Sequence, residues 1–228
     1  MAQRLFERSQ SLARQVDVTR IALWCLLSLP LFAAEPDVKS VLKGVENRYN
    51  RARTLQVQFT ETYTGQGRPR QQEAGQLVLR KPGRMRWDYS LPAGKLFLSD
   101  GKNVYLYSPD AKRVERMPLK ESEDMRAPLA FLLGKLDFGK EFRDISMKSE
   151  AENHLISATA KSDKLPYDRI EMLITPGFEI RRLLVNGLDK SVLTYRFDQE
   201  KLNPQVDDGQ FKFQMPAGAT LVNPDIAQ

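Results

Sequence analysis

Hydrophobic and polar side chains alternate along residues 77–108, which is the pattern of β-strands whose two faces have different surroundings. Met85, Trp87 and Tyr89 occupy every second position, so their side chains project from one side of a sheet. An Asp-Gly pair at residues 100–101 separates two further alternating runs and favours a tight hairpin turn. The pattern predicts antiparallel strands with a strongly apolar face, which must cover a core, a second sheet or a ligand.

Before these strands the apolar residues recur with the period of an α-helix. Apolar residues recur at helical spacing behind Asp37, a plausible N-cap, and predict an amphipathic helix over residues 37–53. From Leu55 onward apolar and polar residues alternate with a period of two, which is typical of β-strands. Strands are predicted at residues 55–60, 71–80, 84–89, 95–99, 103–107, 113–117, 142–148, 154–160, 169–174, 179–185 and 191–197, with a final strand-like segment at 211–214.

Residues 118–139 interrupt the alternation. They contain an apolar cluster, Pro128 to Leu133, that is too crowded for a half-exposed strand, and we expect a short helix to begin near Pro128. The predicted fold is therefore mainly β (α+β), with about ten or eleven short antiparallel strands, a leading helix and one interrupting helix. Because about eight strands already enclose room for side chains or one small ligand, this larger sheet leaves space for the helices and a guest.

The N-terminal residues predict a secretory signal peptide. Residues 1–20 carry four arginines and two acidic residues, residues 21–29 are apolar, and Ala33 and Ala34 offer a small-residue cleavage site. The apolar stretch is shorter than the roughly 20 residues that span a bilayer. Cys25, the only cysteine, lies inside it behind large residues, which argues against a lipoprotein signal. We expect a signal peptide at 1–34 and a disulfide-free domain at 35–228 in the periplasm.

Charge and candidate chemistry exclude several classes of protein. Removing residues 1–34 lowers the net charge from +6 to +4, and the remaining charges are interspersed, so no nucleic-acid partner is expected. The single histidine, His154, and the lack of other cysteines disfavour a zinc site, and no Gly-x-Ser-x-Gly elbow is present. We expect no catalytic residue, no metal and no cofactor. Hydrolysis that depended on His154 would contradict this expectation.

Several short segments together carry a resemblance to a known family. In chain order they are Phe59-Thr60-Glu61, GQLVLRKPGRMRW at 75–87, SDGK at 99–102, YLYSP at 105–109, PLAFLL at 128–133 and FKFQMPAG at 211–218. By their order and spacing the chain resembles the LolA family of periplasmic carriers for outer-membrane lipoproteins. The resemblance implies an unclosed half-barrel whose concave face is covered by helices, with an apolar cavity for acyl chains.

The resemblance also implies partners and site residues. Members collect acylated lipoproteins from an inner-membrane ABC transporter and pass them to an outer-membrane receptor, and we expect a monomer. The implied cavity and lid positions are Tyr49, Leu55, Met85, Trp87, Leu98, Leu129, Phe131, Leu132 and Leu133. A basic residue before a proline, commonly arginine, tethers the lid in the family. Here Lys81 occupies that position with Arg80 beside it, and lysine lacks the planar fork of arginine.

Other interpretations remain open at this point. Without the resemblance, the Met85, Trp87 and Tyr89 stripe would be an ordinary core. Arg80 and Lys81 would then be solvated turn charges. The same half-barrel would also suit a lipoprotein-sensing regulatory module, or a carrier of another amphiphile such as a glycolipid, because a fold does not determine its cargo.

Overall fold

The computed structural model describes residues 37–65, 68–69, 72–119, 136–163 and 165–222. The chain divides into two units, residues 1–36 and 37–228, and every described residue belongs to the second. The predicted signal peptide and the helix expected near Pro128 lie outside the described residues. In the described part, no helix is both long and apolar enough to cross a membrane.

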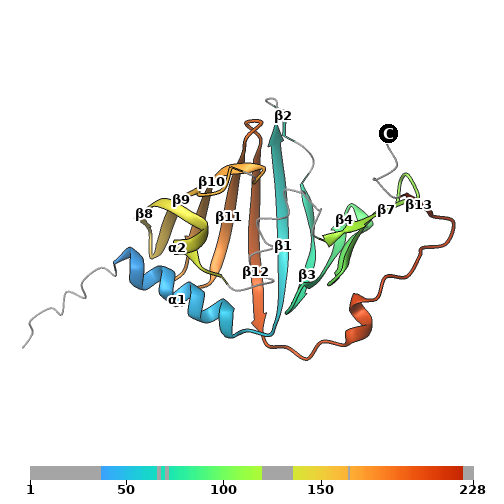
Figure 1. Cartoon of the computed structure of the whole chain (residues 1–228), viewed down its shortest axis with the longest axis horizontal. Helices are drawn as coiled ribbons and strands as arrows, with labels where there is room; N and C mark the ends of the chain where they lie inside the picture. The colour runs from blue at the N-terminus through green and yellow to red at the C-terminus, as the bar shows by residue number, and fades with distance from the viewer. Residues whose placement is uncertain (1–36, 66–67, 70–71, 120–135, 164, 223–228) are drawn as a thin grey trace, which may run out of the picture. The chain divides into compact units, whose positions relative to one another are not determined.

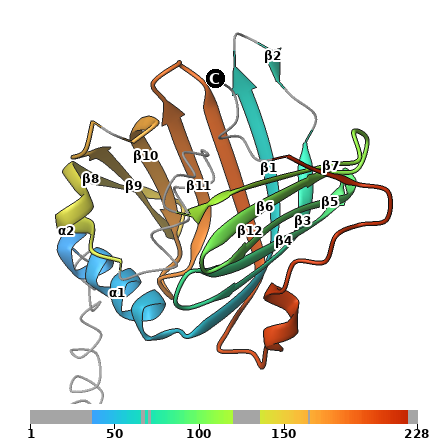
Figure 2. The same cartoon turned by 45° about the vertical axis from the view of Figure 1, so that its right-hand side comes forward.

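The described residues form one large curved sheet (Figures 1 and 2). Its strands follow the order β13-β7-β6-β5-β4-β3-β1-β12-β11-β10-β9-β8, and β2 pairs with β1 beside this path. The sheet is open, because β13 and β8 are its edges and do not pair with each other. The fold class is therefore the mainly β, unclosed architecture that the sequence predicts.

Most neighbours along the chain are also neighbours in the sheet, as tight antiparallel turns require. The strands are β1 (Thr54–Gly65), β2 (Arg68–Pro69), β3 (Glu73–Arg80), β4 (Arg84–Leu91), β5 (Ala93–Asp100), β6 (Asn103–Ser108), β7 (Arg113–Pro118), β8 (Phe142–Glu150), β9 (Asn153–Ala160), β10 (Tyr167–Ile174), β11 (Ile180–Gly187), β12 (Val192–Leu202) and β13 (Thr220–Val222). Two pairings join strands that are distant along the chain: β1 pairs with β12 and so joins the two halves of the sheet, and β13 pairs with β7.

Helix α1 (Val38–Arg51) begins where the sequence predicts. The Asp37 carboxylate accepts hydrogen bonds from the backbone N–H groups of Lys39 and Ser40, which satisfies two of the free donors of the first turn. The apolar side of α1 faces the sheet, and the helix crosses the lower ends of the strands in the β8–β12 half (Figure 1). A second helix, α2 (Phe138–Glu141), lies close to α1 and β8 (Figures 1 and 2).

The C-terminal segment differs from the prediction. Residues 211–214 form no strand; Phe211 is the last residue of a short 3-10 helix, η3 (Asp208–Phe211), and β13 further along the chain pairs in parallel with β7. The Phe213 ring stacks on Tyr105 with centroids 4.4 Å apart, and Phe211 is buried. The alternating phenylalanines therefore attach this segment across the sheet by their rings rather than by a strand ladder. The short β2 and β13 bring the number of described strands to thirteen.

Candidate functional site: the concave face of the sheet

Cross-strand pairing brings the predicted apolar residues into two rows on the concave face. Residues directly opposite each other in antiparallel strands project from the same face. The first row consists of Leu55, Leu79, Met85, Ser99 and Val104, and the second of Val57, Leu77, Trp87, Phe97 and Leu106. Ser99 is the one polar member of these rows, and its hydroxyl donates to the Gly83 carbonyl oxygen. The sequence-predicted residues Leu55, Met85 and Trp87 thus lie on one wall, which crosses β1 and β3–β6.

Beyond these rows an aromatic cluster surrounds Trp87. The Phe59 ring lies edge-on to Trp87 at 4.6 Å and to Tyr89 at 5.2 Å, between ring centroids. Phe59 and Tyr89 meet because Gly75, the residue between them on β3, has no side chain. A Cβ atom at Gly75 would lie 2.1 Å from the Asp88 carbonyl oxygen. Edge-to-face packing adds stability beyond the buried area, so this glycine helps to define the wall.

Trp87 is fully buried, and its indole N–H has a polarisable sulfur atom as its hydrogen-bond acceptor. The indole N–H donates to the sulfur of Met85 at 2.9 Å. On its other side Trp87 packs against Tyr195 of β12, with ring centroids 5.7 Å apart. A flexible thioether and large rings form a wall that can adapt to irregular apolar surfaces.

Polar side chains mark the end of this wall that lies away from α1. Glu73 continues the β3 face beyond Gly75, directly opposite Glu61 on β1. The Lys95 ammonium contacts both carboxylate oxygens of Glu73, at 2.6 and 2.5 Å, and lies 4.5 Å from the centroid of the Tyr89 ring. The concave face therefore changes from apolar to charged along the strands, with the aromatic cluster at the boundary.

Helix α1 closes the opposite end through a polar network. The Glu200 carboxylate of β12 accepts hydrogen bonds from Arg48 Nε and Nη2, at 3.0 and 2.7 Å, and from the Tyr49 hydroxyl at 2.6 Å. The Tyr49 hydroxyl also accepts from the backbone N–H of Ile180. Burial, reinforced by the charge of Glu200, raises the pKa of Tyr49 well above its usual value, so Tyr49 is the neutral donor in this network.

The space between α1 and the sheet is nearly filled. Tyr49, Leu55 and Leu77 help to line a small cavity of about 20 Å³, which is room for about one water molecule. Tyr49 and Leu55, two predicted cavity residues, therefore meet in a packed layer under α1. In the described part of the chain, no helix lies over the aromatic cluster on the β3–β5 side (Figures 1 and 2).

Leu98 corrects one expectation for the cavity. The register places it opposite Arg86 on β4 and Tyr105 on β6, whereas its neighbour Phe97 lies opposite Trp87. Leu98 therefore projects from the convex face, although it is fully buried. The physical reason is the C-terminal segment, which covers this part of the convex face with Phe211 and so buries both sides of β5.

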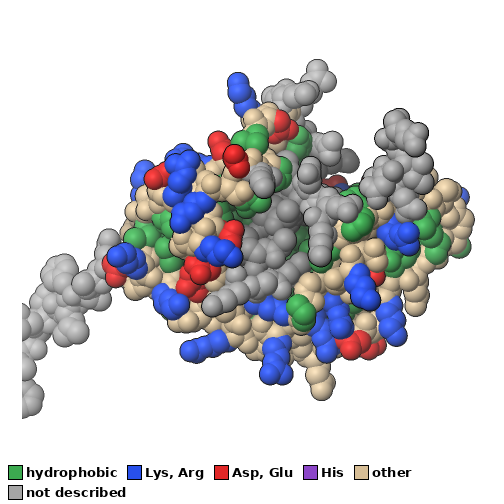
Figure 3. Space-filling model, in the orientation of Figure 1, with side chains coloured by type: hydrophobic (Ala, Val, Ile, Leu, Met, Phe, Trp, Pro, Cys, Tyr) green, Lys and Arg blue, Asp and Glu red, His purple; other side chains and the backbone are tan. Residues whose placement is uncertain are grey.

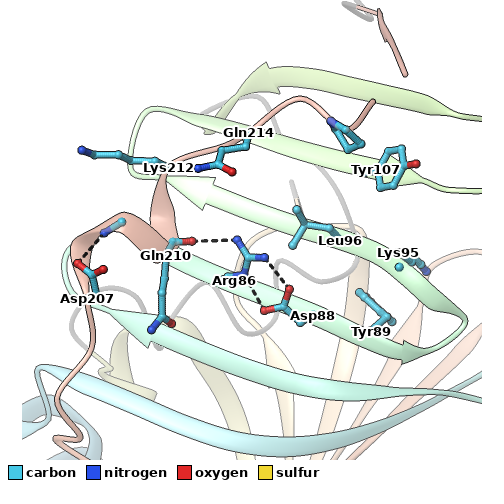
Figure 4. A pocket seen from close by; sticks show the side chains of 13 residues that line it. Arg86, Asp88, Tyr89, Lys95, Leu96, Tyr107, Asp207, Gln210, Lys212 and Gln214 are labelled. Carbon is cyan, nitrogen blue, oxygen red and sulfur yellow. Dashed lines mark hydrogen bonds and ion pairs between the residues drawn. The ribbon is translucent and has the colours of Figure 1, made fainter. Parts of the chain in front are cut away.

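An open groove with a volume of about 750 Å³ lies on the convex face, between that segment and the sheet (Figure 4). Arg86 spans it, donating to the Asp88 carboxylate at 2.6 and 2.7 Å and to the Gln210 carbonyl oxygen at 3.1 Å. Leu96 and Tyr107 lie on its floor between charged and amide side chains (Figure 4). The groove is mainly polar, and Tyr89 and Lys95, at the charged end of the concave face, also contribute to its lining.

The two predicted latch residues occupy different places. Arg80 projects from the convex side, where it donates to the Val206 carbonyl oxygen at 3.0 Å and pairs with Asp208 at 2.6 Å. Lys81 reaches the end of α1, and its ammonium donates to the Tyr49 carbonyl oxygen at 2.8 Å. Burial lowers the pKa of Lys81 below its usual value. The four lid positions, Leu129, Phe131, Leu132 and Leu133, lie outside the described residues, so the latch stays a prediction.

Sequence reasoning missed several residues of the site. Phe59, Phe97 and Tyr195 carry the alternation signal, which could have found them. Glu200 and Arg48 gave no such signal, because a charged strand residue and a charged helix residue usually face solvent. Among the described residues, no group of three or more His, Cys, Asp or Glu side chains could hold a metal ion.

Comparison with known proteins gives concordant matches. A model of the family described as "Outer membrane lipoprotein carrier protein LolA" matches residues 50–214. An outer-membrane lipoprotein carrier protein of Azotobacter vinelandii is 26% identical over 205 residues, which cover 89% of this chain and 97% of that protein. One from Methylobacillus flagellatus is 27% identical over 169 residues, covering 74% and 82%. An uncharacterized conserved protein of Thermus thermophilus shares the fold, with a TM-score of 0.51, 12% identity and coverage of 81% of this chain and 98% of that one.

Proposed function

Because the chain belongs to the LolA family of outer membrane lipoprotein carrier proteins, we propose that it carries acylated lipoproteins through the periplasm. It would receive them from an inner-membrane ABC transporter and deliver them to an outer-membrane receptor, after export through the predicted signal peptide at 1–34. Carriers of this family are chaperones, and the proposed task needs no covalent chemistry. The observation that carries the proposal is the apolar aromatic wall on the concave face.

The energetics explain why such cargo needs a carrier. Burying one methylene group contributes about 0.8 kcal/mol, so an acyl chain of about 14 carbons represents about 11 kcal/mol. A lipoprotein with more than one such chain leaves a membrane at a useful rate only if another apolar surface replaces the lipid. The two rows and the aromatic cluster offer an apolar surface of this kind across β1 and β3–β6.

The boundary of the wall suits an amphipathic cargo. We assign the acyl chains to the side of Phe59, Trp87 and Phe97, and the polar head and the following polypeptide to the end marked by Glu73 and Lys95. Charged groups at that end can satisfy the amide and ester groups of the head, which would be costly to bury among aromatic rings. Tyr49, Leu55 and Met85 complete the wall toward α1, and the apolar residues 129–133 form the proposed lid.

The test uses Trp87 as an internal probe. Of the two tryptophans in the sequence, Trp24 lies in the predicted signal peptide, so Trp87 is the single tryptophan of the expected exported domain at 35–228. The titrant is a synthetic diacylglyceryl-cysteine peptide with brominated acyl chains, because bromine quenches indole fluorescence only near contact. We expect saturable quenching by the acylated peptide and none by the same peptide without acyl chains. Absence of quenching would refute acyl binding at this wall.

A matched pair of variants tests which face binds. Phe97 and Leu98 are adjacent, both are buried, and they project from opposite faces. Phe97→Ala should weaken binding of the brominated peptide by about tenfold, since losing about 1.4 kcal/mol of apolar contact has this effect. Leu98→Ala should lower stability without changing the affinity. Equal effects of the two variants on affinity would contradict the assignment to the concave face.

A further inference from the structure

A basic groove lies at the end of the sheet where α1 terminates. Its volume is about 650 Å³, and it is lined by Arg51, Arg53, Thr54, Arg80, Lys81 and residues 203–206. Four of these residues are basic and none of the described lining residues is acidic. In the space-filling view, Lys and Arg side chains gather along the corresponding lower edge (Figure 3). This groove shares no lining residue with the two rows of the apolar wall.

Its walls are held in place by hydrogen bonds that each involve the backbone. The Arg53 N–H donates to the Asn203 side chain and the Asn203 N–H donates to the Thr54 carbonyl, each at 2.8 Å. The Lys81 N–H donates to the Arg53 carbonyl at 2.9 Å, and the Thr54 hydroxyl donates to Pro204. The groove is therefore formed before any ligand arrives, which lowers the entropic cost of binding.

Its positive charge is largely uncompensated. Arg51 and Arg53 are exposed, and within the described ranges neither guanidinium forms an ion pair. Lys81 is half-buried and donates to a neutral carbonyl oxygen. Like charges held this close repel one another, so their proximity costs stability unless an anion binds between them.

The chain itself shows how a carboxylate binds at the margin of the groove. Asp208 Oδ1 lies 2.6 Å from Arg80 Nη1 and 2.8 Å from Arg84 Nη1, so one carboxylate serves two guanidinium groups. Among the described residues, Arg51, Arg53 and Lys81 have no such acidic partner, and an external carboxylate can supply one. Guanidinium groups bind carboxylates with a fixed fork of donors, which gives such contacts orientation as well as charge.

We propose that this groove docks an acidic protein segment of a transport partner. The inference rests on the proposed function, because a carrier must dock at a donor and at a receptor. A protein segment fits better than a lipid surface, since the cations line a recess between the 203–206 segment and the β3–β4 turn, which a flat bilayer does not enter. Complementary charges at the rim of an interface chiefly raise the rate of association, and salt weakens their attraction.

The experiment uses the full chain and a fluorescein-labelled oligoglutamate peptide as the probe. We expect the peptide to bind, and its affinity to fall as NaCl rises. Arg51→Glu/Arg53→Glu should weaken binding by about tenfold or more. The matched control Lys39→Glu/Lys148→Glu changes the net charge equally at two exposed lysines far from the groove, and it should alter affinity by less than about twofold.

Three results would overturn the proposal, besides the competition by inorganic phosphate described below. They are no binding of the peptide, equal loss in the two charge-reversed variants, and tighter binding of phosphatidylglycerol vesicles than of the peptide through the same arginines. Inorganic phosphate should not compete at millimolar concentration, and competition would indicate a small-anion site instead. Quenching of Trp87 by the brominated lipopeptide should be unchanged in Arg51→Glu/Arg53→Glu. Failure of acyl binding and failure of docking are therefore separate results.

Discussion

Substituting Glu200 with glutamine tests whether a buried ionic network anchors α1 to the sheet. The side chain of Glu200 is 7% exposed and accepts three hydrogen bonds, two from Arg48 and one from the Tyr49 hydroxyl. Glutamine keeps the shape and one acceptor oxygen but removes the charge. The glutamine side chain has an NH₂ group where glutamate has its second oxygen. This NH₂ group and the Arg48 guanidinium are both hydrogen-bond donors, so they cannot bond to each other.

The expected magnitude follows from these contacts. Hydrogen bonds to charged groups contribute about 1.5–3 kcal/mol each, and breaking a buried ion pair costs about 3–5 kcal/mol. The cost here is smaller, because Arg48 is 24% exposed and keeps its contact with Glu179 at 3.1 Å. We expect Glu200→Gln to lower the free energy of unfolding by about 2 kcal/mol, which is about 4–8 °C in Tm for a domain of this size.

Guanidinium denaturation of the full chain measures this loss. Tyr49→Phe should cost about 1–2 kcal/mol, because it leaves the Ile180 N–H without its acceptor. The double variant should lose less than the sum of the two, by about 1 kcal/mol, since both remove the same contact. Glu152→Gln, at an exposed turn, is the control and should change stability by less than about 0.5 kcal/mol. A change that small at Glu200, or strict additivity with Tyr49→Phe, would refute the reasoning.

Two further predictions concern positions outside this network. Gly75→Ala should lower the free energy of unfolding by about 2 kcal/mol or more, because the new Cβ would lie 2.1 Å from the Asp88 carbonyl oxygen. Gly139→Ala is the control and should be tolerated, because its new Cβ would have its nearest neighbour at 3.6 Å. Equal melting temperatures of the two variants would contradict this prediction. Burial acts to raise the pKa of Asp100, but hydrogen bonds from the backbone N–H groups of Asn103 and Lys102 outweigh it and hold the pKa below 3.8. Its stabilisation is therefore present above that value and lost as pH falls through the lower native pKa, so unfolding measured at pH 7 and near pH 3 should show a smaller acid loss for Asp100→Asn than for the original chain.

The periodicity of apolar residues predicted the helices and strands well where one face of the element is buried and the other is exposed to solvent. The helix predicted at 37–53 is observed as α1, and its cap Asp37 is confirmed. The Asp-Gly pair at 100–101 connects β5 to β6, with Gly101 at φ +95°. In these segments the local sequence alone favours the observed conformation, because turn chemistry and the buried face agree.

The same signal failed where both faces of a strand are covered. In β5, Leu96, Phe97 and Leu98 are consecutive, so alternation cannot tell which of them faces the concave side. The answer depends on residues 211–213, more than a hundred positions away, which cover the convex face. Tertiary packing of this kind leaves no local trace, and it explains why the prediction placed Leu98 on the wrong wall.

Glu200 shows a second limit, which comes from backbone irregularity. The pairing of β1 with β12 shifts between Gln56 and Gln58, and Gln199 has φ +55° beside this shift. In the bulged strand Glu200 reaches Arg48 and Tyr49 of α1. A bulge changes which face a side chain occupies, so a strict period of two assigns the residue incorrectly.

Lys81 links the two proposed sites. Its backbone fixes one wall of the basic groove, while its ammonium donates to the last turn of α1 through the Tyr49 carbonyl oxygen. Because burial alone lowers its pKa, an acidic segment in the groove would stabilise the charged form and attract it away from that oxygen. Docking and the end of α1 would then be coupled, and the coupling must be reciprocal. A change at the α1 end of the cavity on cargo binding would alter the affinity of the groove for its partner, which is what a carrier with two docking partners requires.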